Sequence, residues 1–231
     1  MLNNQLAKYH VIIPAAGSGS RMGAGSPKQY LQLNGQPLIE HVLKTFAQAN
    51  KISSIHVILS PTDSHSHSDF VTHSHKISVH HIGGETRAQT VLNALSVIKA
   101  DTDDWILVHD AARPGLSNQL LNHLITSLEH DAVGGLLALP LADTLKRANA
   151  DGTVAQTIAR DALWLAQTPQ MFKYATLKKA LETYSTSPTD EAQAIEALGL
   201  KPTLVTGELQ NMKVTYPQDL AVLTALLKSA D

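Results

Sequence analysis

Short runs of β-branched residues alternate with longer runs of helical periodicity, and this alternation limits the fold more than any other feature of the chain. Strand patterns cover residues 9–14, 55–60, 77–82, 105–110 and 132–140, and helical patterns cover 38–49, 86–100 and 118–130. Such an order is typical of α/β folds in which helices cover a mostly parallel sheet. We therefore expect a Rossmann-like, layered α/β architecture.

The segment from about 140 to 172 departs from this alternation. Its stretch DTLKRANADGTVAQTI has the pattern of two strands around a turn at 149–152, with too few apolar residues to bury itself. We therefore expect a β-arm that stands off the sheet and is used in dimerisation. The regular pattern then returns with a helix over about 188–198, a strand over 202–207 and a final helix opened by Pro217.

Length and composition favour one soluble domain over residues 1–231, with the arm inserted. The 231 residues are 43% hydrophobic, enough for one substantial core, and they contain no long linker. A net charge of −2 argues against a general nucleic-acid binder. Because the chain has no cysteine, it can form neither a disulfide framework nor a thiolate zinc site. No apolar run approaches a membrane span, and the first residues lack the apolar stretch of a signal peptide, so we expect a cytoplasmic protein.

The stretch VIIPAAGSGSRMGAGSPKQYL begins as the first strand and continues as a long loop, which is rich in small residues and carries Arg21 and Lys28. Small residues allow close backbone approach and cations add charge, so the loop is suited to a polyphosphate. It is not a dinucleotide fingerprint, since Met22 stands where the third glycine belongs, and it lacks the G-K-[ST] end of a P-loop. The sequence HDAARP follows another strand, so both segments should lie at the carboxyl edge of the sheet, where α/β folds bind ligands.

The pattern P-A-A-G-x-G-x-R-M, followed by P-K-Q-Y-L, resembles the triphosphate loop of nucleotidylyltransferases of the glycosyltransferase-A-like nucleotide-binding family. The PKQYL segment narrows the resemblance to the 2-C-methyl-D-erythritol 4-phosphate cytidylyltransferase family. Six further motifs occur in the family's order, so the resemblance covers nearly the whole chain: GGETRAQTVLNAL, VHDAARP, DTLKR, TPQMF, TDEA and NMKVTYPQDL. It implies transfer of the cytidylyl group of CTP to 2-C-methyl-D-erythritol 4-phosphate, with release of pyrophosphate, in the non-mevalonate route to isoprenoids.

The resemblance also implies roles for individual residues. The catalytic cations would be Arg21, Lys28 and Lys213, and Asp110 would help to hold Mg²⁺ or another divalent cation bound to CTP. Arg87 would brace the turn at the base site. The nucleotide-binding positions would be Pro14, Ala15, Ala16, Gly17, Ser18, Gly19, Gly84, Glu85, Thr90, Asp110 and Ala111. The sugar phosphate would meet Arg113, Thr144, Arg160 and Thr168.

Two positions depart from the commonest family pattern, which has Asp where Glu85 stands and Ser where Thr90 stands. The resemblance further implies a homodimer in which the arm crosses over, so that Thr144 and Arg160 complete the neighbour's site. The expected partners are therefore CTP, the methylerythritol phosphate and a second copy of the chain, with neither nucleic acid nor membrane.

Two alternatives stay open at this stage. Another sugar-phosphate nucleotidylyltransferase would share the loop, and the tract SHSHSDFVTHSHK, with four of the twelve histidines, would suit a histidine-rich metal-binding protein. No strand or helix pattern orients those histidines, whereas metal sites depend on oriented ligands. We therefore interpret His65, His67, His73 and His75 as surface residues.

Overall fold

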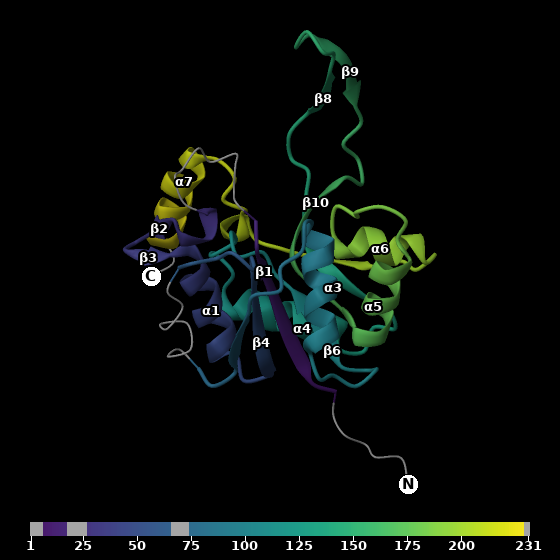
Figure 1. Cartoon of the computed structure of the whole chain (residues 1–231). Helices are drawn as coiled ribbons and strands as arrows, with labels where there is room; N and C mark the ends of the chain where they lie inside the picture. Colours follow the sequence, from purple (N-terminus) through teal and green to yellow (C-terminus); the bar gives the residue numbers. More distant parts are fainter. Residues whose placement is uncertain (1–6, 18–26, 66–73, 229–231) are drawn as a thin grey trace.

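A seven-stranded sheet forms the centre of the computed structural model, which describes residues 7–17, 27–65 and 74–228 (Figure 1). The strand order is β11-β7-β10-β6-β1-β4-β5, and every neighbouring pair is parallel except the two that β10 makes with β6 and β7. The α/β class with a mostly parallel sheet is therefore confirmed. The strands are β1 Tyr9–Ala15, β4 Ile52–Leu59, β5 Ile77–His80, β6 Trp105–Val108, β7 Gly134–Pro140, β10 Trp164–Lys173 and β11 Thr203–Thr206.

Helices cover both faces of this sheet because neighbouring residues of its strands point to opposite sides. Val11 and Ile13 of β1 are buried with residues of α1 and α4, whereas Ile12 is buried with residues of α3, α5 and α6. Two apolar cores thus lie on either side of one sheet. The helices are α1 Leu38–Gln48, α3 Arg87–Val97, α4 Asn118–Leu128, α5 Tyr174–Thr183, α6 Glu191–Ala197 and α7 Pro217–Lys228, with short 3₁₀ turns η2 Lys28–Tyr30 and η3 Leu209–Asn211.

Helix α5 is missing from the sequence-based prediction. It follows β10 directly and begins without a side-chain hydrogen bond at its N-cap, so no start signal marks it. By contrast, the expected helices α3, α4 and α6 begin with the capping side chains of Thr86, Ser117 and Asp190, each of which accepts a backbone N–H.

The arm is present but shorter than expected. Strands β8 Leu145–Ala148 and β9 Val154–Ile158 pair antiparallel and stand clear of the sheet (Figure 1). The expected end of the arm at 172 is wrong, because β10 belongs to the central sheet. Met171 and Phe172 have no exposed surface, and burying them in the core stabilises this strand between β6 and β7.

Candidate active site

The ends of β1 and β6 lie side by side and open onto a pocket with an empty volume of about 700 Å³. The loop after β1 and the segment after β6 therefore meet at one edge, as expected from the sequence. The pocket is lined by Pro14, Ala15, Ala16, Gly17, Lys28, Gln29, Gly84, Glu85, Thr86, Arg87, Thr90, Asp110, Ala111, Ala112 and Lys213.

Most of the nucleotide-binding positions implied by the resemblance lie in this lining, together with Lys28 and Lys213. Ser18, Gly19 and Arg21 lie outside the described residues. The four sugar-phosphate positions, Arg113, Thr144, Arg160 and Thr168, are not part of the lining.

Gln29, to which the sequence motifs gave no separate role, links η2 to the end of β1. Its side-chain amide is buried and donates to the carbonyl of Ala15 at 2.8 Å. This bond holds the neighbouring Lys28 beside the pocket. The only sequence signal for Gln29 was its place in PKQYL.

The turn before α3 is shaped by two glycines and by Thr90. A Cβ at Gly83 would stand 2.3 Å from Cβ of Ala16, so only glycine allows this turn to approach the first loop. The Thr90 hydroxyl accepts from the Gly84 N–H at 3.1 Å and donates to the Thr86 carbonyl at 2.9 Å. Thr90 thus supports the backbone of the pocket wall.

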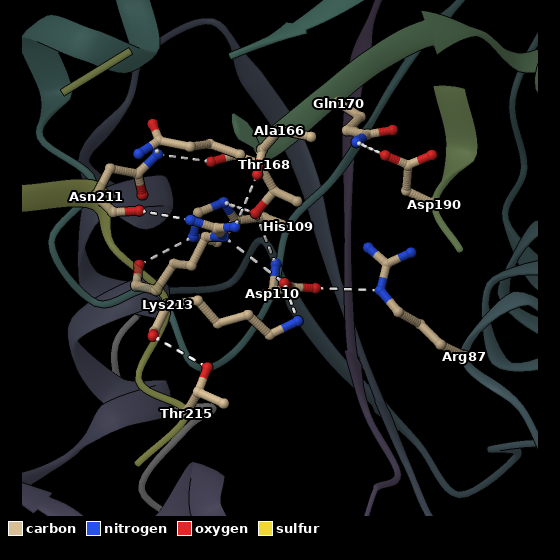
Figure 2. A network of polar contacts seen from close by, with 12 residues as sticks. Arg87, His109, Asp110, Ala166, Thr168, Gln170, Asp190, Asn211, Lys213 and Thr215 are labelled. Carbon is tan, nitrogen blue, oxygen red and sulfur yellow. Dashed lines mark hydrogen bonds and ion pairs between the residues drawn. The ribbon is translucent and has the colours of Figure 1, made fainter. Parts of the chain in front are cut away.

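Three cations surround the carboxylate of Asp110, and two of them, Arg87 and Lys213, are labelled in Figure 2. Arg87 Nε lies 3.1 Å from Oδ1, while Lys213 Nζ and Arg113 Nε lie 2.7 Å and 3.7 Å from Oδ2. Burial by itself would raise the pKa of Asp110, but Arg87, Lys213 and Arg113 outweigh it and hold that pKa well below its usual range. Asp110 is therefore a carboxylate at neutral pH.

Glu191 holds Arg87 from the other side. Its Oε1 lies 2.6 Å from Nη1 of Arg87, and the side chain is buried at the start of α6. Burial raises the pKa of Glu191, and the charge of Arg87 opposes this rise. The sequence indicated TDEA as a motif but assigned no role to Glu191, because its partner is 104 residues away.

Arg113 serves as a brace in this structure. The side chain is buried, with Nη1 donating to the carbonyl of Asn211 at 2.8 Å and Nη2 to that of Ala166 at 3.2 Å. It thereby joins β10 to η3, which leads into the segment of Lys213. The implied contact of Arg113 with the sugar phosphate stays a prediction.

His109 and Thr168 form a hydrogen-bonded chain whose direction follows from its acceptors (Figure 2). The carbonyl of Arg113 can only accept, so Nε2 of His109, 3.1 Å away, carries a hydrogen. Burial lowers the pKa of His109 to about 4, so the ring is neutral and its Nδ1 accepts from Thr168, 3.0 Å away. The Thr168 oxygen then accepts the backbone N–H of Asp110 at 3.1 Å.

The two arm residues lie away from the pocket of their own chain. Thr144 and Arg160 are exposed at the base of the β8–β9 hairpin, and Arg160 Nη1 donates to the carbonyl of Ala142. The structure therefore does not bring them to Lys28, Asp110 or Lys213 within one chain.

Within the described part of the histidine tract, His65 stacks on Tyr30 with ring centroids 4.1 Å apart and contacts Asp63. His67 and His73 lie outside the described residues. No group of three His, Cys, Asp or Glu suited to a metal occurs among the residues that the structure covers. In the same ranges, no helix is long and apolar enough to cross a membrane.

A sheet-edge pocket lined by a small-residue loop, two lysines and a carboxylate is suited to a nucleoside triphosphate, as the class of nucleotidyltransferases requires. Residues 9–229 match the family described as 2-C-methyl-D-erythritol 4-phosphate cytidylyltransferase, so the chain belongs to that family. It is similar to the enzyme of that name from Chromobacterium violaceum, with 52% identity over 95% of this chain and 98% of the relative. The corresponding protein of Nitrosospira multiformis is 51% identical over 97% of this chain and 99% of its own length.

Solved structures agree with this assignment. A crystal structure of a 4-diphosphocytidyl-2C-methyl-D-erythritol synthase has a TM-score of 0.85 and 39% identity, and covers 96% of this chain and 99% of its own. The Francisella tularensis 2-C-methyl-D-erythritol 4-phosphate cytidylyltransferase has a TM-score of 0.79 and 36% identity, and covers 94% of this chain and 98% of its own.

Proposed function

We propose that the pocket at the ends of β1 and β6 binds CTP, and that Lys28 and Lys213 stabilise its phosphates during the reaction. The reaction is transfer of the cytidylyl group of CTP to 2-C-methyl-D-erythritol 4-phosphate, which gives 4-diphosphocytidyl-2-C-methyl-D-erythritol and pyrophosphate. One observation supports the site most strongly: both lysines and Asp110 line the same pocket as the backbone of Ala15, Gly17 and Gly84. Small residues and cations together suit a triphosphate.

The chemistry requires charge stabilisation more than proton transfer. The attacking group is a phosphomonoester with a second pKa of about 6, so it is mostly dianionic at neutral pH and needs no general base. The barrier arises from repulsion between this dianion and the triphosphate. Lys28 and Lys213 reduce that repulsion, and they stabilise the charge that develops on the equatorial oxygens and on the leaving pyrophosphate.

Asp110 fits a Mg²⁺ ion that is bound mainly by phosphate oxygens. Magnesium keeps several waters and usually takes one or two protein carboxylates, so a single ionised Asp at the pocket wall is sufficient. When bound, the ion supplies further neutralisation of the triphosphate. Asp110 would hold the ion on the protein side, and Arg87 and Glu191 fix the position of Asp110.

The arm suggests a homodimer in which each arm contributes to the neighbour's site. Val154 of β9 is 62% exposed and Leu165, near the start of β10, is 53% exposed, which is unfavourable for apolar side chains surrounded only by water. Two-fold pairing would cover these side chains and bring Thr144 and Arg160 to the other subunit's pocket. A cytoplasmic location, expected from the sequence, stays a prediction.

The function is tested by incubating the protein with Mg²⁺, 2-C-methyl-D-erythritol 4-phosphate and each nucleoside triphosphate in turn, and by measuring pyrophosphate release. We expect release with CTP that depends on the sugar phosphate. A preference for UTP or GTP would contradict the nucleotide assignment, and release without the sugar phosphate would contradict the acceptor.

A further inference from the structure

Both oxygens of Asp110 are in contact with cations in the arrangement that the structure shows. Oδ1 contacts Nε of Arg87 at 3.1 Å, and Oδ2 contacts Nζ of Lys213 at 2.7 Å. A magnesium–oxygen bond is about 2.0 to 2.1 Å long, so an ion at either oxygen would stand close to a cation that already occupies it. The positive charge of these cations therefore opposes metal binding at Asp110 unless one of them moves away.

The cations differ in how firmly they are held. Arg87 is also bound to the buried carboxylate of Glu191 at 2.6 Å, and Arg113 is bound to two backbone carbonyls. For Nζ of Lys213, Asp110 is the one polar partner found within the described ranges. The Lys213 side chain is also 34% exposed, compared with 10% for Asp110. Lys213 can thus move away without breaking a second polar contact to the part of the chain that the structure describes.

The geometry points to an exchange at Oδ2 of Asp110, in which Lys213 takes the place of the divalent cation until the nucleotide arrives and then moves to a phosphate. This inference rests on the proposed binding of CTP and Mg²⁺ in the pocket. It gives Lys213 a second role, as the counter-ion of Asp110 in the nucleotide-free protein.

The exchange couples the metal to the nucleotide. Without CTP, a metal ion at Asp110 would displace Lys213 and leave two positive groups close together with one carboxylate between them. With CTP, the displaced lysine gains a phosphate oxygen, and the metal gains further oxygen ligands. The protein should therefore bind free metal weakly and bind metal and nucleotide cooperatively. The nucleotide should raise the affinity for the metal by the same factor by which the metal raises the affinity for the nucleotide.

The test measures binding of Mn²⁺, a spectroscopic substitute for Mg²⁺, to the full chain by electron paramagnetic resonance, first without nucleotide and then with CTP. Wild type is compared with Lys213→Met, Asp110→Asn and the double variant. Lys51→Met is the matched control, because Lys51 Nζ also lies 2.7 Å from a carboxylate, that of Glu129, on the surface. Thermal melting checks that each variant is folded.

We expect Lys213→Met to bind Mn²⁺ in the absence of nucleotide at least about fivefold more tightly than wild type, since a nearby positive charge is gone. Adding Asp110→Asn should abolish this gain, and Lys51→Met should show none. An equal gain in Lys51→Met, or no gain in Lys213→Met, would overturn the exchange.

The Asp110→Asn variant separates this inference from the proposed metal site. If it loses Mn²⁺ binding in the presence of CTP while Lys213→Met shows no gain, the exchange is wrong and the metal site stands. If Asp110→Asn binds Mn²⁺ and CTP as wild type does, both the site and the exchange are wrong.

Discussion

The hydroxyl of Thr168 is held between Nδ1 of His109, at 3.0 Å, and the backbone N–H of Asp110, at 3.1 Å. Thr168 comes from β10 and the other two residues follow β6, so this hydroxyl joins two neighbouring strands at the pocket edge. Because its single hydrogen is used by His109, it cannot also donate to a substrate.

Thr168→Val should therefore destabilise the protein by about 1 to 3 kcal/mol, since it leaves buried polar groups of His109 and Asp110 without a partner. Thr168→Ser keeps the hydroxyl and should therefore lose much less stability. Urea unfolding measures both. A Val variant of normal stability with a raised KM for the sugar phosphate would instead support direct contact between Thr168 and the substrate.

Lys28→Ala should lower turnover by at least about a hundredfold without unfolding the protein, because it removes charge stabilisation from the phosphate site. The same loss of turnover is expected for Arg21→Ala, although Arg21 lies outside the described residues. Lys99→Ala, on an exposed position, is the control. Steady-state rates and thermal melts check the prediction, and near-normal turnover in Lys28→Ala would refute it.

Asp110→Asn should raise the Mg²⁺ concentration needed for half-maximal activity by about tenfold or more, while the KM for the sugar phosphate changes less. The reason is that the variant loses the charge of the carboxylate that would bind the metal ion, and not a group that would contact the sugar phosphate. Magnesium titrations of the variant, of wild type and of the exposed-site control Asp103→Asn measure this. An unchanged magnesium requirement would count against Asp110 as a metal ligand.

Mixing Lys28→Ala subunits with Arg160→Ala subunits should restore activity that neither variant has alone. In a mixed dimer with crossed arms, one site carries both defects and the other carries none. With random exchange about half of the dimers are mixed, so about a quarter of wild-type activity per subunit is expected. If a tag pull-down shows subunit exchange and the mixture stays inactive, Arg160 acts within its own chain.

Acid should destabilise the protein through His56. Its Nε2 lies 2.8 Å from the Ser54 hydroxyl and its Nδ1 lies 3.1 Å from Nε2 of His80. Burial, and then the neighbouring His80 and His10, lower the pKa of His56 to about 4, compared with about 6.5 for an unfolded histidine. Between these values the unfolded chain binds a proton that the folded chain does not, so the contribution is fully present above about pH 6.5 and is lost as the pH falls towards 4.

The free energy of unfolding should therefore depend less on pH in His56→Asn than in wild type. Its slope against pH should be smaller by up to about 1.4 kcal/mol per pH unit. Urea unfolding between pH 4.5 and 7 measures the difference from wild type, with His123→Asn on the exposed face of α4 as the control. Parallel curves for wild type and His56→Asn would show that His56 does not carry the effect.

The alternation of strand and helix patterns determined the α/β class, and the order of motifs determined the family. Local signals also located the loop after β1 and the segment after β6 at one edge, because the carboxyl ends of parallel strands meet there. The motifs PKQYL, VHDAARP and NMKVTYPQDL identified Lys28, Asp110 and Lys213. Each of these residues could therefore be found from its neighbours in the sequence.

Only the tertiary structure showed what these residues contact. Glu191 holds Arg87 across 104 residues of sequence, and Thr168 reaches His109 across 59. Strand β10 enters the sheet although the turn pattern before it favoured an arm up to 172. Motifs are read from neighbouring residues, whereas burial and pairing depend on which distant segments fill the same space. That is why the sequence indicated the chemistry of the pocket, and the fold alone decided which side chains hold Asp110 in place.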